Sequence, residues 1–134
     1  MITTGDARNI LFQDCSVFGI KDIYTSWAIP RGSVTRERIV VVSPPTQSQS
    51  TYWETCFIPV NFCVPDIKDE ANLKRLDEIE RAVKERFKES TFGWHDGSAY
   101  TYQAESIGRE EDKDLKCHYI YARIIFRVLN VKNT

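Results

Sequence analysis

The sequence lacks the motifs of the common enzyme classes. It contains no G-x-x-x-x-G-K-[ST] or G-x-G-x-x-G phosphate loop, no H-E-x-x-H and no nucleophile elbow. It also lacks Cys/His spacing for zinc, and the acidic run "REEDKD" has neither the spaced ligands nor the turn glycine of an EF-hand loop. We therefore expect no catalytic residue, no metal and no cofactor, and a protein that is not an enzyme.

The sequence also lacks an excess of charge of either sign and any long hydrophobic run. Its 18 Lys/Arg and 19 Asp/Glu give a formal net charge of −1, so no basic face for sequence-specific binding of nucleic acid is expected. The longest apolar runs, "RIVVV" and "YARIIF", are far shorter than the roughly 20 residues of a membrane span. The N-terminus does not resemble a signal peptide. These features predict a cytoplasmic protein without a membrane partner.

Cysteine is present four times but never as C-x-x-C. If residues 55–64 form a strand, Cys56 and Cys63 point to opposite faces and lie roughly 23 Å apart. At that separation they cannot share a disulfide or a zinc ion. With Cys15 and Cys117 isolated in the sequence, we expect four unpaired, mostly buried thiols, as is usual in a reducing cytosol.

The length and the absence of a composition break predict a single domain over residues 1–134. Residues 4–18 are typical of a short helix, with Thr4 or Asp6 as its N-cap and Gly19 as its end. Strands are expected within 22–30, 36–43 and 55–64. The last two form a hairpin over 36–65, around the proline-containing loop "PPTQSQST". Pro59 cannot donate to a β-ladder, so it should face an edge or a bulge.

The clearest element is a long amphipathic helix from about residue 69 to 89. Asp69 is its expected N-cap, and one stripe is apolar: Leu73, Leu76, Ile79, Val83 and Phe87. A final hairpin follows, with strands within 99–107 and 117–131. The element order α-β-β-β-α-β-β predicts an α+β fold. In it, one long and one short helix cover one face of a mostly antiparallel sheet of four or five strands.

The stretch "GWHDGS", residues 93–98, admits two interpretations. His95 and Asp96 could act together as a general base, as in a small hydrolase. Adjacent residues rarely converge on one reacting atom, so a helix-to-strand turn shaped by the glycines is the favoured interpretation. His118, on the core-facing side of the last strand, is expected to be a satisfied, partly buried histidine and not a metal ligand.

The second face of the last strand mixes tyrosine and arginine with Ile125 and Leu129. Tyrosine and arginine are enriched where proteins meet other proteins. We therefore predict self-association through this face, with the 44–53 loop as a second contact. The residues assigned to these contacts are Tyr52, Trp53, Tyr119, Tyr121, Arg123 and Arg127.

Three stretches resemble the small tail-completion or tail-terminator proteins of long-tailed phages and prophages. "DIYTSWAIPRGSVTRERIVVVS" is similar to the first two strands of that family and their connection. "TCFIPVNFCVPDIKDEANLKRLDEIERAVKERF" is similar to the strand that runs into the long helix. "YTYQAESIGREEDKDLKCHYIYARIIFRVLNV" resembles the closing hairpin. The likeness is one of pattern, because the family has no invariant catalytic motif.

The resemblance implies a non-enzymatic structural subunit that forms a ring, usually a hexamer. Such rings terminate the tail at the head–tail junction, so the implied partners are further copies, the tail tube and head-completion proteins. The implied location is the host cytoplasm and then the virion tail. The alternative is a monomeric cytosolic binding module, or a small hydrolase that uses His95 and Asp96.

Overall fold

A computed structural model describes residues 2–25, 28–43, 48–49 and 53–129 of the chain. Helix α1 (Thr4–Asp14) continues into the 3₁₀ helix η1 (Cys15–Phe18), and helix α2 (Leu73–Phe87) lies between the fourth and fifth strands. The strands are β1 (Asp22–Thr25), β2 (Arg38–Val41), β3 (Ser48–Gln49), β4 (Trp53–Pro65), β5 (Thr91–His95), β6 (Ser98–Asp112) and β7 (Cys117–Leu129).

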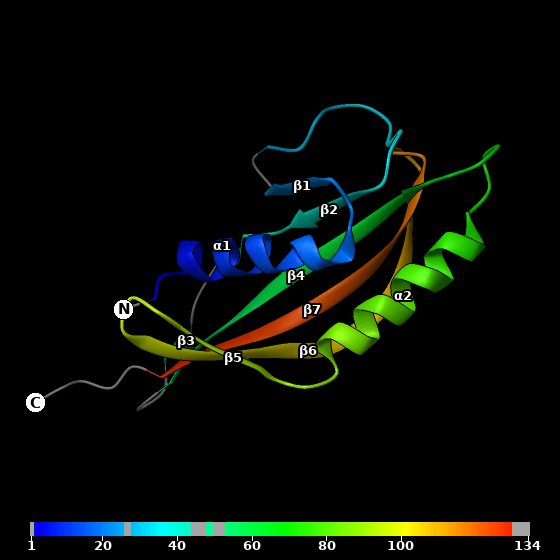
Figure 1. The fold of residues 1–134 in the computed structure, drawn as a ribbon. Coiled ribbons are helices and arrows are strands. Elements are labelled where there is room, and N and C mark those ends of the chain that lie inside the picture. Colours follow the sequence, from blue (N-terminus) through cyan, green and yellow to red (C-terminus); the bar gives the residue numbers. More distant parts are fainter. Residues whose placement is uncertain (1, 26–27, 44–47, 50–52, 130–134) are drawn as a thin grey trace, which may run out of the picture.

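These strands form one curled, mixed sheet, shown in Figure 1. Its order is β1-β2-β4-β7-β6-β5, and the two-residue β3 pairs with β4 outside that path. Neighbouring strands are antiparallel except for β1 and β2, which are parallel. The α+β organisation with two α-helices agrees with the sequence prediction. The predicted four or five strands in the order α-β-β-β-α-β-β are wrong, because β3 and β5 are additional strands.

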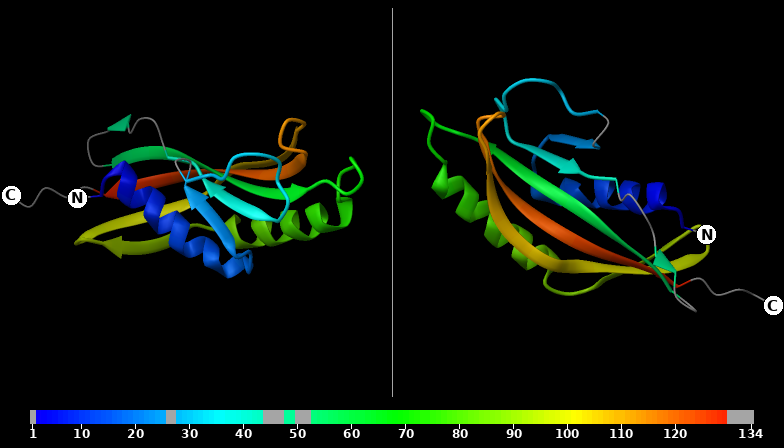
Figure 2. Two further views of the ribbon diagram at one scale, coloured as in Figure 1. Left: turned by 90° about the horizontal axis from the view of Figure 1, so that it is seen from above. Right: turned by 180° about the vertical axis from the view of Figure 1, so that it is seen from behind.

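Both helices lie on the same face of the sheet, as Figures 1 and 2 show. The alternation of side chains along β4 and β7 directs one set towards the helices, where Ile58, Phe62, Ile124 and Phe126 are completely buried. Helix α2 covers them with Leu76, Ile79, Val83 and Phe87. The predicted stripe is correct except for Leu73, which is 62% exposed at the first position of the helix.

The helix starts differ from those predicted. The N-cap of α1 is Thr3, whose hydroxyl accepts a hydrogen bond from the Asp6 backbone while the Asp6 carboxylate accepts one from the Thr3 backbone. This reciprocal capping box replaces the expected caps at Thr4 or Asp6. Gly19 adopts the left-handed conformation that ends η1, as predicted. Helix α2 is capped by Asn72, and the expected cap Asp69 instead lies in a turn with φ 63°.

Pro59 lies within β4, where β4 pairs with β7 on one side and with β2 on the other. The Pro59 carbonyl accepts a hydrogen bond from Val42 N–H at 2.9 Å, so the backbone groups of this residue point towards β2. Strand β2 ends at Val41, one residue earlier. Pro59 therefore lacks its N–H on the side of β4 where β2 has just ended, and the ladder between β4 and β7 stays intact. This agrees with the expectation that Pro59 faces an edge.

Strand β5 occupies part of the stretch that the sequence suggested was a helix-to-strand turn. It forms a hairpin with β6 through two residues, Asp96 and Gly97, whose φ angles are 50° and 75°. Two successive positive φ angles are typical of the tight type I′ hairpin turn. Among the described residues, no helix is long and apolar enough to cross a membrane.

Candidate functional site

The face of the sheet opposite the helices carries the predicted self-association residues of β7. Viewed from behind in Figure 2, strands β4, β7 and β6 are not covered by either helix. Along β7, Tyr119, Tyr121, Arg123, Ile125 and Arg127 alternate with buried core residues and remain partly or fully exposed. We call this side, opposite to α1 and α2, the open face.

A shallow hollow of about 240 Å³ lies on the open face between β4 and β6. Its wall contains Pro59, Asn61, Glu110, Tyr119, Tyr121 and Arg123. The Tyr121 ring lies over Gly108, its register partner on β6. A Cβ atom at Gly108 would approach the Tyr121 hydroxyl oxygen to 2.5 Å, so only glycine leaves room for the ring over β6.

Tyr119 is held at the side of this hollow by an acidic neighbour. Its hydroxyl donates a hydrogen bond to Glu110 Oε2 at 2.7 Å. The Glu110 carboxylate, together with partial burial, raises the pKa of Tyr119 to about 12. The phenol therefore stays protonated at neutral pH and keeps one lone pair directed away from Glu110.

Arg123 lies flat on an aromatic ring and not in a buried ion pair. Its guanidinium carbon is 4.0 Å from the centre of the Phe57 ring of β4. Its second contact is an ion pair with Glu105 at 3.4 Å, in which both side chains are about half exposed. Such a cation, stacked but still accessible, can donate hydrogen bonds to a carboxylate or carbonyl of another molecule.

The open face extends to the edge strand β5. Phe92 and Trp94 alternate with inward residues there and are 61% and 68% exposed. The two rings pack edge to face, with centres 5.7 Å apart. In register, Phe92 lies opposite Thr101 of β6, and Thr101 lies opposite Arg127 of β7, so all three residues share the open face.

The sequence analysis missed these two aromatic residues and Phe57. Phe92 and Trp94 were hidden because "TFGWH" was assigned to a turn, although the alternation of Phe92 and Trp94 with smaller residues was a signal for a strand. Of the predicted contact residues, the structure brings together Tyr119, Tyr121 and Arg123. Arg127 is exposed on the same face. Tyr52 lies outside the described residues, and Trp53 is described only as the first residue of β4.

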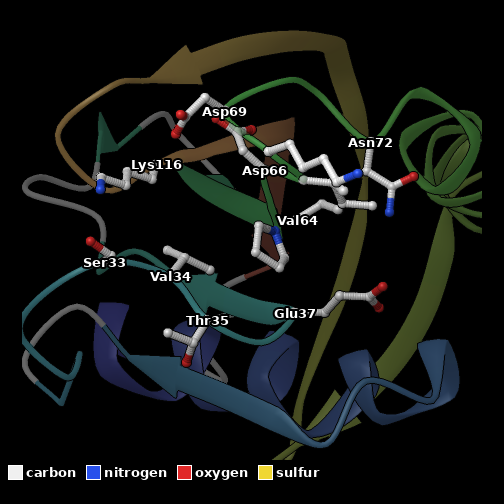
Figure 3. A pocket seen from close by; sticks show the side chains of 12 residues that line it. Ser33, Val34, Thr35, Glu37, Val64, Asp66, Asp69, Asn72 and Lys116 are labelled. Atoms are coloured by element: carbon white, nitrogen blue, oxygen red, sulfur yellow. The ribbon is translucent and has the colours of Figure 1, made fainter.

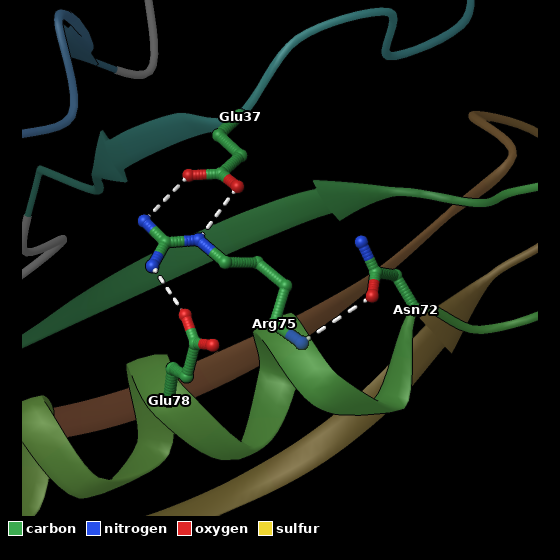
Figure 4. A network of polar contacts seen from close by, with 4 residues as sticks. All are labelled: Glu37, Asn72, Arg75 and Glu78. Carbon is green, nitrogen blue, oxygen red and sulfur yellow. Dashed lines mark hydrogen bonds and ion pairs between the residues drawn. The ribbon is translucent and has the colours of Figure 1, made fainter.

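A larger cleft, of about 630 Å³, lies at the far end of the sheet (Figure 3). Residues 33–37 form one side of it, and the other side is formed by the end of β4 and residues 66–72. Glu37 at its rim binds Arg75 of α2 through both carboxylate oxygens, at 2.7 and 2.8 Å. Figure 4 shows that Glu78 and the Asn72 cap complete this network. The polar groups at this rim therefore fix the segment before β2 to the start of α2.

His118 lies beside this cleft and is held on both ring nitrogens. Nδ1 is 2.7 Å from Asp66 Oδ1, and Nε2 is 3.1 Å from Glu111 Oε2. Because both nitrogens have carboxylate partners, neither is directed at a molecule bound in the cleft. His118 is thus the satisfied, partly buried histidine that the sequence predicted. Among the described residues, no group of three or more Cys, His, Asp or Glu side chains is placed to hold a metal ion.

His95 and Asp96, the alternative hydrolase pair, belong to the β5–β6 hairpin. The His95 ring faces α1, with Nε2 3.7 Å from Asp6 Oδ1. Asp96 occupies the tight turn, with a positive φ angle. The histidine is therefore directed towards a helix cap and not towards a nucleophile.

Comparisons with protein-family models, curated proteins and solved structures give no match to this chain.

Proposed function

We propose that this protein is a non-enzymatic structural subunit that assembles with copies of itself through the open face. The single observation that carries the proposal is the composition of that face. It places Tyr119, Tyr121 and a stacked, accessible Arg123 around a hollow, with Phe92 and Trp94 at its edge. Exposed aromatic residues beside arginine are typical of the centres of protein–protein interfaces.

The proposed setting is the completion of a phage or prophage tail, as a ring at the head–tail junction. Its support is the resemblance of the sequence to tail-terminator proteins, which implies a hexamer and contacts with the tail tube and head-completion proteins. A ring requires a heterologous contact, in which the open face of one copy meets a different surface of the next copy. Among the described strands, β1 and β5 are the two ends of the sheet order, and they supply further surfaces because a strand edge can add a strand from a neighbour.

Native mass spectrometry of the purified chain, at micromolar and tenfold higher concentration, tests this proposal. A single discrete ring size, or a monomer that converts to one as concentration rises, is the expected result. A monomer at both concentrations would contradict assembly of the chain by itself. A broad series of masses would contradict a closed ring.

The double variant Tyr121→Ala/Arg123→Ala tests the open face itself. It removes the groups at the centre of the hollow but no buried core contact, so the circular dichroism spectrum should be unchanged while the ring fraction falls at least about tenfold. The matched control is Lys74→Ala/Arg81→Ala, on the exposed side of α2. If both double variants assemble like the wild type, the hollow is not the interface.

A second variant, Phe92→Ser/Trp94→Ser, tests the edge of the same face. These side chains are mostly exposed in the single chain, so their removal should change stability little while weakening assembly. Loss of assembly in this variant alone would move the interface from the hollow to the edge strand β5.

A further inference from the structure

Two cysteines that are distant in the sequence meet on the open-face side of the sheet, at the end nearest β2. Cys63 of β4 and Cys117 of β7 belong to a small buried cluster with Val34, separate from the main core. Both side chains are buried, with 6% of Cys63 and 1% of Cys117 exposed. The contact was not foreseen, because 54 sequence positions separate the two residues and neither lies in a C-x-x-C motif.

Arg38 of β2 gives this pair an unusual environment. It is 6% exposed, and its Nε has no hydrogen-bond partner. Among the described residues no ion pair joins Arg38 to a carboxylate, and Asp22, its register partner on β1, pairs with Arg36 at 3.0 Å. A buried positive charge needs an opposite charge close by. The register places Cys63 directly opposite Arg38, so the two side chains lie on the same side of the sheet.

The two thiols are therefore not equivalent. The neighbouring Cys117 thiol and the Arg38 charge lower the pKa of Cys63. Cys117 lies opposite Asp112 of β6, and the Cys63 sulfur, burial and this carboxylate raise the pKa of Cys117. Tyr119, which neighbours Cys117 on β7, stays neutral at pH 7 because its pKa is about 12. Of the two sulfurs, Cys63 is the one that lies directly opposite Arg38.

We propose that Cys63 and Cys117 form a peroxide-reactive dithiol site, in which Arg38 stabilises Cys63 as the nucleophile and Cys117 resolves it as a disulfide. The inference is independent of the proposed assembly function. It rests on the meeting of the two sulfurs beside a buried guanidinium, at a place where the strands end. Cys117 is the first residue of β7, and Cys63 lies two residues before the end of β4.

The reaction uses hydrogen peroxide as the oxidant. The Cys63 thiolate attacks one peroxide oxygen, the O–O bond breaks, and hydroxide leaves while Cys63 becomes a sulfenic acid. The Cys117 sulfur then attacks the Cys63 sulfur, the S–O bond breaks, and the leaving oxygen takes the Cys117 proton to form water. Two electrons pass from the two sulfurs to the peroxide. The products are one disulfide, one water and one hydroxide.

Access and geometry favour this pair over the other buried cysteines. Val34 contacts the pair and also lines both the 630 Å³ cleft and a second hollow of about 300 Å³ that Arg38 lines. Both hollows are therefore lined by a side chain that packs with the two thiols. The two cysteines are diagonal neighbours across the ladder, since Cys63 lies opposite Tyr119 and Cys117 opposite Pro65. Diagonal pairs are about 7–8 Å apart at Cα, so the strand ends move slightly closer when the disulfide forms.

The experiment treats the reduced, folded chain with hydrogen peroxide and then blocks the remaining thiols with iodoacetamide in denaturant. Peptide mass spectrometry is expected to find a Cys63–Cys117 disulfide, with Cys15 and Cys56 alkylated. Cys15 is the internal control, because burial raises its pKa to about 12. Equal oxidation of all four cysteines would overturn the proposal, and so would disulfides between chains in place of the internal one.

Three variants test the assigned roles. Cys117→Ser should accumulate a sulfenic acid at Cys63 that dimedone traps. Arg38→Met should slow Cys63 oxidation about tenfold, the effect of one pKa unit on the thiolate fraction at a pH below the pKa. Arg36→Met, which alters an exposed arginine nearby, should leave the rate unchanged. An unchanged rate in a folded Arg38→Met variant would overturn the role of Arg38, and absence of dimedone trapping in Cys117→Ser would overturn the role of Cys63.

Discussion

Gly93 and Gly108 are the two strand glycines whose hydrogen atoms face a tyrosine ring on the neighbouring strand. A Cβ at Gly93 would lie 2.4 Å from the Tyr100 hydroxyl oxygen, and one at Gly108 would lie 2.5 Å from that of Tyr121. The consequences differ because the tyrosines differ. Tyr100 is stacked on Phe126 against the core, with ring centres 5.1 Å apart, whereas Tyr121 lies on the open face and can swing away.

Alanine at these two glycines is therefore expected to have unequal effects. Gly93→Ala forces a packed ring out of the stack and should lower the free energy of unfolding by about 1–3 kcal/mol. Gly108→Ala should lower it by less than about 1 kcal/mol, because only a surface ring moves. Urea denaturation of both variants measures the difference. Equal losses would mean that Tyr100 is no more constrained than Tyr121.

At the scale of elements, the capping box at the start of α1 links helix stability to pH. Hydrogen bonds with Thr3, together with the charge interaction with His95, hold the pKa of Asp6 below its ordinary value. A carboxylate whose pKa is lower in the folded state stabilises the fold above its unfolded pKa, about 3.9, and that stabilisation is lost as the pH falls through the folded value.

Asp6→Asn should remove this part of the pH dependence. The amide oxygen can still accept from the Thr3 backbone, but it has no charge to lose between about pH 5 and pH 2. Urea denaturation over this range should therefore show a smaller loss of stability in the variant than in the wild type. Asp114→Asn, in the exposed β6–β7 turn, is the control and should follow the wild type. An identical acid profile for Asp6→Asn would show that the box does not depend on charge.

At the scale of the whole molecule, one buried hydroxyl connects three elements. Tyr102 of β6 donates to Asp14 Oδ2 at the end of α1 and accepts from Arg86 Nη2 near the end of α2, both at 2.6 Å. Arg86 also binds Thr91 at the start of β5. Arg86 Nη2 also lies 4.0 Å from Asp14 Oδ2, so a direct ion pair between the two helices adds to their common anchor on the sheet.

Tyr102→Phe keeps the ring and removes that anchor. Arg86 and Asp14 then lose a shared partner in a partly buried site, so we expect the free energy of unfolding to fall by about 1–3 kcal/mol. Tyr100→Phe is the matched control, because the Tyr100 hydroxyl makes no hydrogen bond to a described residue, and it should change stability by less than about 0.5 kcal/mol. Thermal or urea denaturation separates the two. A small effect of Tyr102→Phe would mean that water replaces its hydroxyl.

The sequence by itself determined the elements that carry strong periodicity. The apolar stripe of α2 and the alternation along β4 and β7 follow from spacing alone, because burial on one side selects every second residue of a strand or every third to fourth residue of a helix. The opposite orientation of Cys56 and Cys63 and the partly buried His118 followed from the same alternation. The burial of all four thiols followed from the apolar character of free cysteine.

Only the tertiary structure decided which residues meet across the sheet. Strand β5 was missed because Gly93 and the "HDG" turn are local signals for a loop. Its pairing with β6 instead depends on the Tyr100 ring, which fills the space beside Gly93. Strand order decides three further features. They are the Cys63–Cys117 contact, the position of Arg38 beside it, and the placement of Phe92 and Trp94 on the open face. Strand order is set by the packing of the whole chain and not by any local run of residues, which is why no spacing in the sequence reveals it.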